Sequence, residues 1–324
     1  MTTPRHAIDP ADLHISVLRD RCVELLAPAL QNPGSVYLDA TTGLGGHTEA
    51  VLQACPNARA VCIDRDTEAL DLAGQRLAPL SDRVDLVHAV FDELPRVVAE
   101  HGRDGRVDAI LFDLGVSSLQ LDDEDRGFAY SRPAPLDMRM DQTRGATAAE
   151  LLARIDLGEL TSLLRLYGEE PHARRYARVI LDRQAERPIE TTDDLAGLIQ
   201  TAAPRGEHRG HPAKRVFQAL RIAVNGELEV LARALPAAID SLRVGGRLVV
   251  LSFQSLEDRI VKRTFVKAST SSAPPDMPVL RPEDAPLLRT LVRGAEQAGT
   301  EERAHNPRSA SVRLRAVEKM RERS

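Results

Sequence analysis

Short apolar runs alternate with amphipathic segments through the first third of the chain. The apolar runs have the length of buried strands, and the segments between them have helical periodicity, as in 67–77. The predicted strands are 36–40, 60–64, 84–87 and 107–113. Strands separated by helices of this size predict a parallel, doubly wound α/β sheet.

This pattern changes in the middle of the chain. Residues 143–204 show helical spacing without strands, which predicts a small helical module inserted into the sheet domain. We therefore expect a sheet domain formed by 1–140 and 211–324, with an inserted helical domain at 141–210. The insert carries many arginines and no cofactor motif, which suggests that it recognises the substrate.

Strand patterns return in the last third. A helix is predicted at about 225–242, a strand at 246–253 and a terminal strand within 309–317. The stretch 269–300 is rich in Pro, Ser and Ala, and is predicted to be irregular.

Composition narrows the classes of function. The 324 residues are 43% hydrophobic and 28% charged, with a net charge of -5, so the whole protein would not attract nucleic acid. A nucleic-acid-binding chain of this kind would have to gather its basic residues on one face. The three cysteines form no CxxC pair, so their spacing indicates neither a metal site nor a disulfide framework. A polar N-terminus and the lack of a membrane-length apolar run favour the cytoplasm.

A glycine-rich turn, residues 39–47, joins the first strand to a helix. Glycines allow a tight turn and a close approach to a ligand, and the helix start offers free N–H groups. The turn is neither a phosphate P-loop nor the dinucleotide fingerprint in register. By itself it could be only a tight strand-to-helix connection.

Acidic residues end two further strands. Asp64 follows the glycine turn by about twenty residues, the spacing of a carboxylate that binds ribose hydroxyls. Asp113 ends the fourth strand, and in this architecture ligands lie beyond the carboxyl ends of strands. Asp113 should therefore face the reactive end of a cofactor. Phe91, after the third strand, is placed near an adenine edge or in the core.

Taken together, these residues resemble the family of bacterial ribosomal small-subunit methyltransferase H, which methylates N4 of cytosine in 16S rRNA. The matching blocks cover nearly the whole chain, and several, such as DLGVSSLQLDD at 113–123, are long enough to be specific. The blocks are 14–18, 42–47, 64–66, 113–123, 126–128, 135–141, 167–170, 211–222, 225–228, 252–259 and 306–308. One departure is Gln254, where the family usually has His.

The resemblance implies a Rossmann-like methyltransferase sheet with a helical insert, and S-adenosylmethionine as cofactor. Its implied substrate is the exocyclic amine of decoding-site cytidine 1402 in 16S rRNA of the small ribosomal subunit. By the same resemblance, seven residues contact the cofactor: Gly45, Gly46, His47, Asp64, Phe91, Asp113 and Gln120. It leaves open whether the chain forms a homodimer.

The target amine is a poor nucleophile, because its lone pair is delocalised into the ring. An enzyme must align it with the methyl group and accept hydrogen bonds from its protons. The candidates for this catalytic role are Asp113, Asp137 and Asn225, in falling order. Since an amide does not titrate, Gln254 is not expected to transfer a proton.

The sequence also suggests where RNA could bind. Lys214, Arg215 and Arg221 form a basic stretch that could contact phosphates or could be an ordinary solvated face.

Other classes of function are less favoured. A C5-cytosine enzyme needs a nucleophilic cysteine near the active strands, and neither Cys55 nor Cys62 is well placed. DNA amino-methyltransferases usually carry Pro-Pro-aromatic after the acidic residue, whereas Leu114 and Gly115 stand here. A non-catalytic nucleoside sensor would not require the intact block 135–141.

Overall fold

The computed structural model describes residues 16–117, 120, 124–204, 210–271, 273 and 281–323. The chain divides into two compact units. The first comprises Met1–Gly115 and Leu228–Ser324, and the second comprises Val116–Glu227. The expected insert, 141–210, lies inside the second unit, and its role in substrate recognition remains a prediction.

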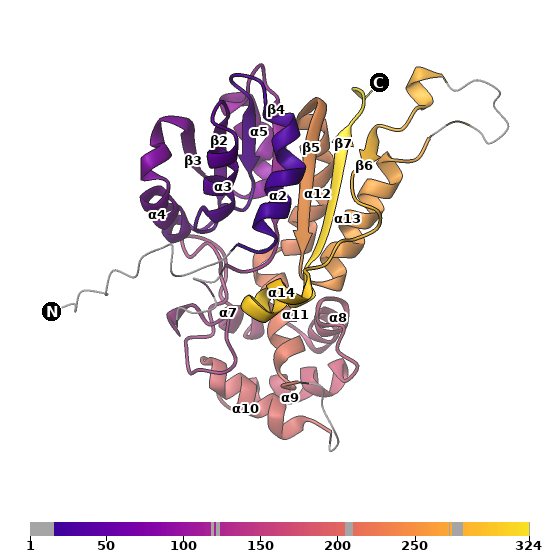
Figure 1. Cartoon of the computed structure of the whole chain (residues 1–324). Coiled ribbons are helices and arrows are strands. Elements are labelled where there is room, and N and C mark those ends of the chain that lie inside the picture. Colours follow the sequence, from indigo (N-terminus) through magenta and orange to yellow (C-terminus); the bar gives the residue numbers. More distant parts are fainter. Residues whose placement is uncertain are drawn as a thin grey trace. The chain divides into compact units, whose positions relative to one another are not determined.

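A seven-stranded sheet in the order β3-β2-β1-β4-β5-β7-β6 forms the first unit (Figure 1). Its strands are β1 (Val36–Asp39), β2 (Arg59–Asp64), β3 (Val84–His88), β4 (Val107–Asp113), β5 (Leu242–Ser252), β6 (Leu288–Thr290) and β7 (Arg313–Lys319). The first five strands are parallel, and β7 is antiparallel to both β5 and β6. The predicted Rossmann-like α/β sheet is confirmed.

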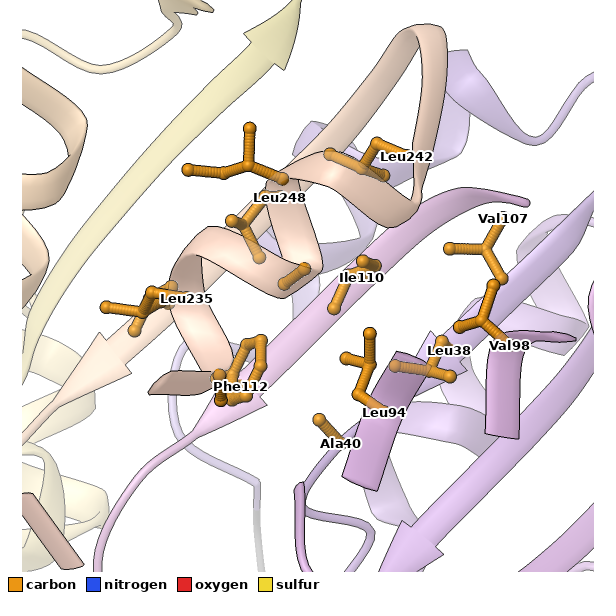
Figure 2. Packing of buried hydrophobic residues seen from close by; sticks show 14 of the residues in the cluster. Leu38, Ala40, Leu94, Val98, Val107, Ile110, Phe112, Leu235, Leu242 and Leu248 are labelled. Carbon is orange, nitrogen blue, oxygen red and sulfur yellow. The ribbon is translucent and has the colours of Figure 1, made fainter. Parts of the chain in front are cut away.

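Apolar residues bury both faces of the central strands. All of β1 is buried, and β4 is buried up to Phe112, as expected for parallel strands covered on two sides. One face packs Leu38, Ile110 and Phe112 against helix residues such as Leu235 (Figure 2). The opposite face forms a second cluster around Tyr37. The contiguous apolar runs in the sequence thus become the middle layer of a three-layer unit.

Helices connect these strands. They are α2 (Arg19–Leu26), α3 (Gly46–Ala54), α4 (Thr67–Arg76), α5 (Leu94–His101), α12 (Glu227–Ser241), α13 (Ser255–Ala268) and α14 (Thr300–His305). Short 3-10 helices lie at Ala27–Ala29, Ala78–Arg83, Phe91–Glu93, Pro282–Asp284 and Pro307–Ser311. Asp66 begins α4 as its N-cap, with its side chain accepting a hydrogen bond from the Glu68 amide at 3.1 Å.

Two local predictions need correction. The stretch 269–300 is not wholly irregular, because β6 pairs within it, with Leu288 opposite Lys319. A three-residue strand is too short to show alternation, and its pairing with β7 defines it. The strand expected at 246–253 begins earlier, at Leu242, which lies opposite Val107 across a shift in register. Gly245, at φ 83°, interrupts the apolar pattern there.

The second unit is helical, as its periodicity predicted. It contains the 3-10 helix Glu124–Arg126 and helices α7 (Ala148–Leu152), α8 (Leu157–Gly168), α9 (Ala173–Glu186), α10 (Thr192–Ala202) and α11 (Lys214–Asn225). Thr147 and Asp156 cap the starts of α7 and α8. Gly168 lets α8 approach α11, since a Cβ there would lie 2.6 Å from the Arg215 carbonyl oxygen. None of the helices in the described part of the chain could span a membrane.

Candidate cofactor site and active site

The glycine-rich turn after β1 is held to the end of β2. The Thr42 amide donates to the Ile63 carbonyl at 3.0 Å, and the Gly43 amide donates to Oδ2 of Asp64 at 2.7 Å. Gly45 has φ 77° as the N-cap of α3, a conformation that favours glycine. A Cβ on Gly46 would lie 2.3 Å from Oγ of Ser16. The turn itself therefore favours glycine at position 45, and the close approach of the Ser16 side chain favours it at position 46.

Asp39, a residue that sequence reasoning did not assign to the site, is fully buried beneath this turn. Its Oδ2 accepts hydrogen bonds from the Tyr37 hydroxyl at 3.1 Å and the Thr48 hydroxyl at 2.8 Å. Burial raises the pKa of Asp39, while the charge of His47 and these hydrogen bonds oppose the rise. Its position at the end of the first strand was the available signal, because Asp64 and Asp113 end strands in the same way.

Asp64 lies at the end of β2, and both of its carboxylate oxygens accept backbone hydrogen bonds. Oδ2 accepts from Gly43, and Oδ1 accepts from the Asp66 amide at 2.9 Å. Burial raises the pKa of Asp64 to about 6, with the two amides working against the rise. Each oxygen has a second lone pair that could accept a ribose hydroxyl.

A buried histidine meets the carboxylate at the end of β4. His47 is the second residue of α3, and its Nε2 lies 3.4 Å from Oδ2 of Asp113. Among the described residues, neither ring nitrogen of His47 has a hydrogen-bond partner, and neither does the buried Oδ1 of Asp113. The Asp113 amide donates to Oγ1 of Thr41 at 2.6 Å, which fixes the strand end against the glycine turn. The pair thus joins the two predicted cofactor segments.

Two further buried acceptors lie at the end of β5, next to β4 in the sheet. Oγ of Ser252 and Oε1 of Gln254 have no hydrogen-bond partner within the described part of the chain. Leu251 stands opposite Asp113 in the register of the two strands. Sequence reasoning did not single out Ser252, whose position at a strand end was again the available signal. Buried polar atoms in native proteins nearly always have a hydrogen-bond partner. The two unpaired oxygens therefore indicate that a ligand or water binds at this edge of the sheet.

The other two predicted cofactor contacts, Phe91 and Gln120, have contacts of their own in the structure. Phe91 packs edge-on against Phe112, with ring centroids 5.6 Å apart, so its ring belongs at least partly to the core. Gln120 lies in the second unit, where its side-chain oxygen accepts from the Ser117 amide at 3.1 Å. Its assignment to the cofactor remains a prediction.

The residues at this edge fit S-adenosylmethionine. Asp64 offers acceptors suited to ribose hydroxyls, and the tight turn before α3 brings backbone close to a ligand. The unsatisfied ring nitrogens of His47 provide polar partners for the amino and carboxylate groups of S-adenosylmethionine.

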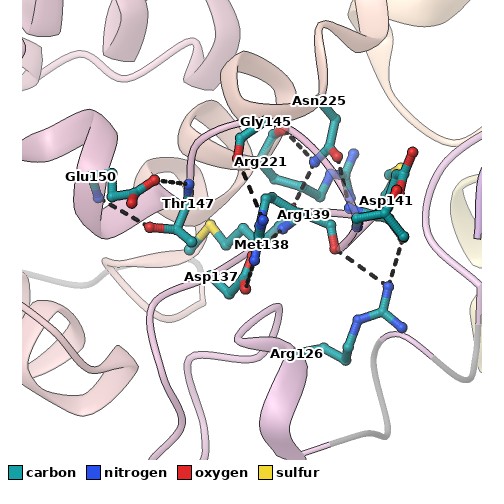
Figure 3. Close-up of polar contacts among 12 residues, drawn as sticks. Arg126, Asp137, Met138, Arg139, Asp141, Gly145, Thr147, Glu150, Arg221 and Asn225 are labelled. Atoms are coloured by element: carbon teal, nitrogen blue, oxygen red, sulfur yellow. Dashed lines mark hydrogen bonds and ion pairs between the residues drawn. The ribbon is translucent and has the colours of Figure 1, made fainter.

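In the second unit, Asp137 and Asn225 organise a loop (Figure 3). The Asn225 side chain accepts from the Met140 amide at 2.8 Å and donates to the Met138 carbonyl at 2.7 Å. Asp137 binds the Arg139 guanidinium through both oxygens, at 2.7 and 2.8 Å. Burial works to raise the pKa of Asp137, but the hydrogen bonds from Arg139 outweigh it and hold this pKa below its usual value. These contacts give the side chains of Asp137 and Asn225 a structural role.

The predicted RNA-binding cations differ in availability. Lys214 is exposed and has no ion pair among the residues that the structure describes. Arg215 is also exposed and donates to the Glu169 carbonyl at 3.1 Å. Arg221 forms a bidentate ion pair with Glu227, at 2.8 and 2.9 Å, and is largely buried. Arg221 is therefore the least available of the three.

The chain is similar to known proteins in sequence and in structure. The chain is 55% identical over 323 residues to a ribosomal RNA small subunit methyltransferase H of Thermobifida fusca, covering 99% of this chain and 98% of the relative. A protein of the same name from Beutenbergia cavernae is 56% identical, with coverage of 99% and 96%. A solved structure of an rRNA methylase from Streptococcus thermophilus is 13% identical with a TM-score of 0.41, covering 94% of each chain.

The family model of the MraW methylases matches residues 11–320. S-adenosylmethionine is accordingly the methyl donor of the chain. With nearly the whole length matched by the family model and by full-length relatives, the chain belongs to the MraW methylase family.

Proposed function

We propose that the chain methylates the exocyclic N4 amine of a decoding-site cytidine in 16S rRNA, using S-adenosylmethionine. Family membership supports methyl transfer, and the names of the relatives support small-subunit ribosomal RNA as the substrate. The choice of the cytosine amine rests on the resemblance of the sequence blocks.

One observation carries the catalytic part of the proposal. Asp113 is a partly buried carboxylate at the carboxyl end of β4, with one oxygen facing His47 and a buried oxygen that has no partner among the described residues. A cytosine amine becomes positively charged as it is alkylated, and a carboxylate oxygen stabilises that charge by accepting an N–H hydrogen bond. Oδ1 of Asp113 is the candidate acceptor.

His47 acts as a positioning residue in this scheme. Its Nε2 lies 3.4 Å from Oδ2 of Asp113 without a hydrogen bond between them, so a small shift of the imidazole would let it donate to Oδ2 and orient the carboxylate while Oδ1 stays available. When bound, S-adenosylmethionine supplies an electrophilic methyl group. The contribution of the chain is to align the amine with that methyl and to hold the amine protons, and alignment alone can supply much of the rate.

The other catalytic candidates receive less support. Both oxygens of Asp137 are bound to Arg139, and the Asn225 amide is bound to the backbone of the 138–140 loop. Using either side chain for catalysis would require breaking contacts that organise the second unit. We therefore place Asp113 first, as the sequence also did.

The second unit is proposed as the substrate-recognition domain. A cytidine within folded RNA must be splayed out for chemistry on its base, and the flanking nucleotides then need a surface to hold them. Lys214 and Arg215 begin α11 on the exterior of this unit and suit phosphate contacts. The cytoplasm remains the predicted location.

Methyl transfer to purified 16S rRNA and to small subunits tests the proposal. A labelled methyl donor reports activity, and mass spectrometry of nuclease digests identifies the modified base. Asp113→Asn should lower kcat at least tenfold, whereas Asp71→Asn, a change at an exposed site on α4, should not. Product other than N4-methylcytidine would refute the assigned target. Cofactor binding with no transfer to either substrate would favour the nucleoside-sensor alternative.

A further inference from the structure

Helix α13 carries a cationic outer face in the first unit. Its exposed side chains include four cations, Arg259, Lys262, Arg263 and Lys267. Val266 is also exposed, with 55% of its surface accessible to solvent. Steps of three and four residues place these side chains along one side of a helix. The inner side holds Val261 and Phe265, which pack into the apolar core of the sheet.

The acidic residues of α13 do not neutralise this face. Both are buried near the helix start. Glu257 accepts from the amides of Phe253 and Gln254, at 2.9 and 3.0 Å. Asp258 binds the Arg315 guanidinium on β7, at 2.7 and 3.1 Å. The helix therefore presents only basic charges outward.

Three of these cations lack acidic partners. Lys262, Arg263 and Lys267 form no ion pair with any residue in the described part of the chain. Several exposed arginines elsewhere in the unit do have acidic partners, as Arg96 does with Glu93. Like charges spaced four residues apart on a helix repel one another and oppose folding. A bound polyanion would relieve this repulsion between the cations.

The position of α13 connects this face to the active edge of the sheet. The helix begins at Ser255, three residues after the end of β5, and β5 lies beside β4, which ends at Asp113. Its 14 residues correspond to roughly 21 Å of helix. It packs beside β5, β6 and β7 (Figure 1). The cationic face thus leads away from the carboxyl edge along the flank of the unit.

We propose that the outer face of α13 binds the phosphate backbone of the RNA substrate, in addition to any contact made by the second unit. This inference rests on the proposed function, because it takes RNA as the substrate. Four cations along one helix suit a chain of phosphates, and long flexible side chains can follow an irregular backbone. With Val266 as the one large apolar side chain exposed on this helix, the face suits a polyanion better than an apolar partner.

The test replaces the three unpartnered cations in the full-length protein, as Lys262→Ala/Arg263→Ala/Lys267→Ala. Binding to a 16S rRNA fragment is measured at several salt concentrations, with cofactor affinity as the check on folding. If all three contact phosphates, the slope of log K against log salt should fall in magnitude by about 2, and affinity at 0.1 M salt should fall about 10- to 100-fold. KM for RNA should rise while kcat and cofactor affinity stay unchanged.

Two matched variants separate charge from other effects. Lys262→Arg/Arg263→Lys/Lys267→Arg keeps every charge and should bind like the wild type. Alanine at three exposed, ion-paired arginines elsewhere in the unit removes the same net charge and should change the slope by much less; these are Arg96, Arg233 and Arg323.

Wild-type affinity and slope in the triple alanine variant would overturn the inference. So would a loss seen only with assembled subunits and not with naked RNA, because the partner of α13 would then be a ribosomal protein. Failure of the proposed function looks different: the wild-type protein itself would then methylate neither RNA nor subunits, whatever the state of α13.

Discussion

Cofactor affinity should depend on the protonation of Asp64. The ribose hydroxyls of S-adenosylmethionine would donate to a carboxylate whose pKa burial raises to about 6. With that pKa, about nine-tenths of the side chain is ionised at pH 7 and about one-tenth at pH 5. If only the ionised form accepts both hydroxyls well, affinity should be about tenfold weaker at pH 5 than at pH 7.

Asp64→Ala should remove both the interaction and its pH dependence. Losing a charged hydrogen-bond partner costs about 1–3 kcal/mol, or roughly 5- to 150-fold in affinity at pH 7. Calorimetric titration from pH 5 to pH 8 measures both effects. Asp71→Ala, at an exposed position on α4, is the control and should bind like the wild type.

The raised pKa of Asp64 makes folding stability depend on pH in the opposite direction from cofactor affinity. A carboxyl whose pKa is raised on folding, here from 3.8 to about 6, stabilises the fold at low pH and loses that contribution as pH rises through 6. The contribution of Asp64 should therefore be about 1 kcal/mol smaller at pH 7 than at pH 5, measured as the wild-type minus Asp64→Ala difference in unfolding free energy. If Asp64→Ala keeps the wild-type pH dependence of cofactor binding, another group causes that dependence, and the reasoning is refuted.

Three other changes give distinct outcomes. Asn225→Leu leaves a buried amide and a buried carbonyl without partners, so it should lower the unfolding free energy by about 2–4 kcal/mol in chemical denaturation; a change under about 0.5 kcal/mol would contradict the structural role. Lys214→Ala/Arg215→Ala should flatten the salt dependence of RNA binding by about 1.4 in slope, and an unchanged slope would make this stretch ordinary surface. Gln254→Ala should reduce the rate less than about tenfold and leave the pH–rate profile intact, because an amide does not titrate; an altered profile would show proton transfer at this position.

Periodicity predicted most of the sheet because its central strands are buried on both faces. The run 107–113 was placed at its observed bounds, since every residue from Val107 to Phe112 is buried. Strand β6 was missed because its three residues are defined by pairing with β7, which leaves no local pattern. Helix α11 was recognised only as a basic stretch, although its apolar side packs into the helical core.

The site residues were harder to rank, because the sequence shows which residues are polar but not what they contact. Asn225 stood in a family block and had the chemistry of an acceptor. Its amide instead holds the backbone of Met138 and Met140, more than eighty positions away along the chain. A long-range contact of this kind leaves no local signature, so a structural asparagine and a catalytic one look the same.

Three aspartates end adjacent strands of the sheet, and their partners distinguish their roles. Asp39 is enclosed by two hydroxyls and supports the turn above it. Asp64 is held by two backbone amides, which leaves lone pairs for hydroxyl donors. Asp113 has a buried oxygen without a hydrogen bond in the described part of the chain, and its other oxygen lies near His47. In this architecture ligands lie beyond the carboxyl ends of strands, which applies equally to all three aspartates. Asp113 keeps the most unused hydrogen-bonding capacity of the three, and we therefore propose it as the acceptor for chemistry.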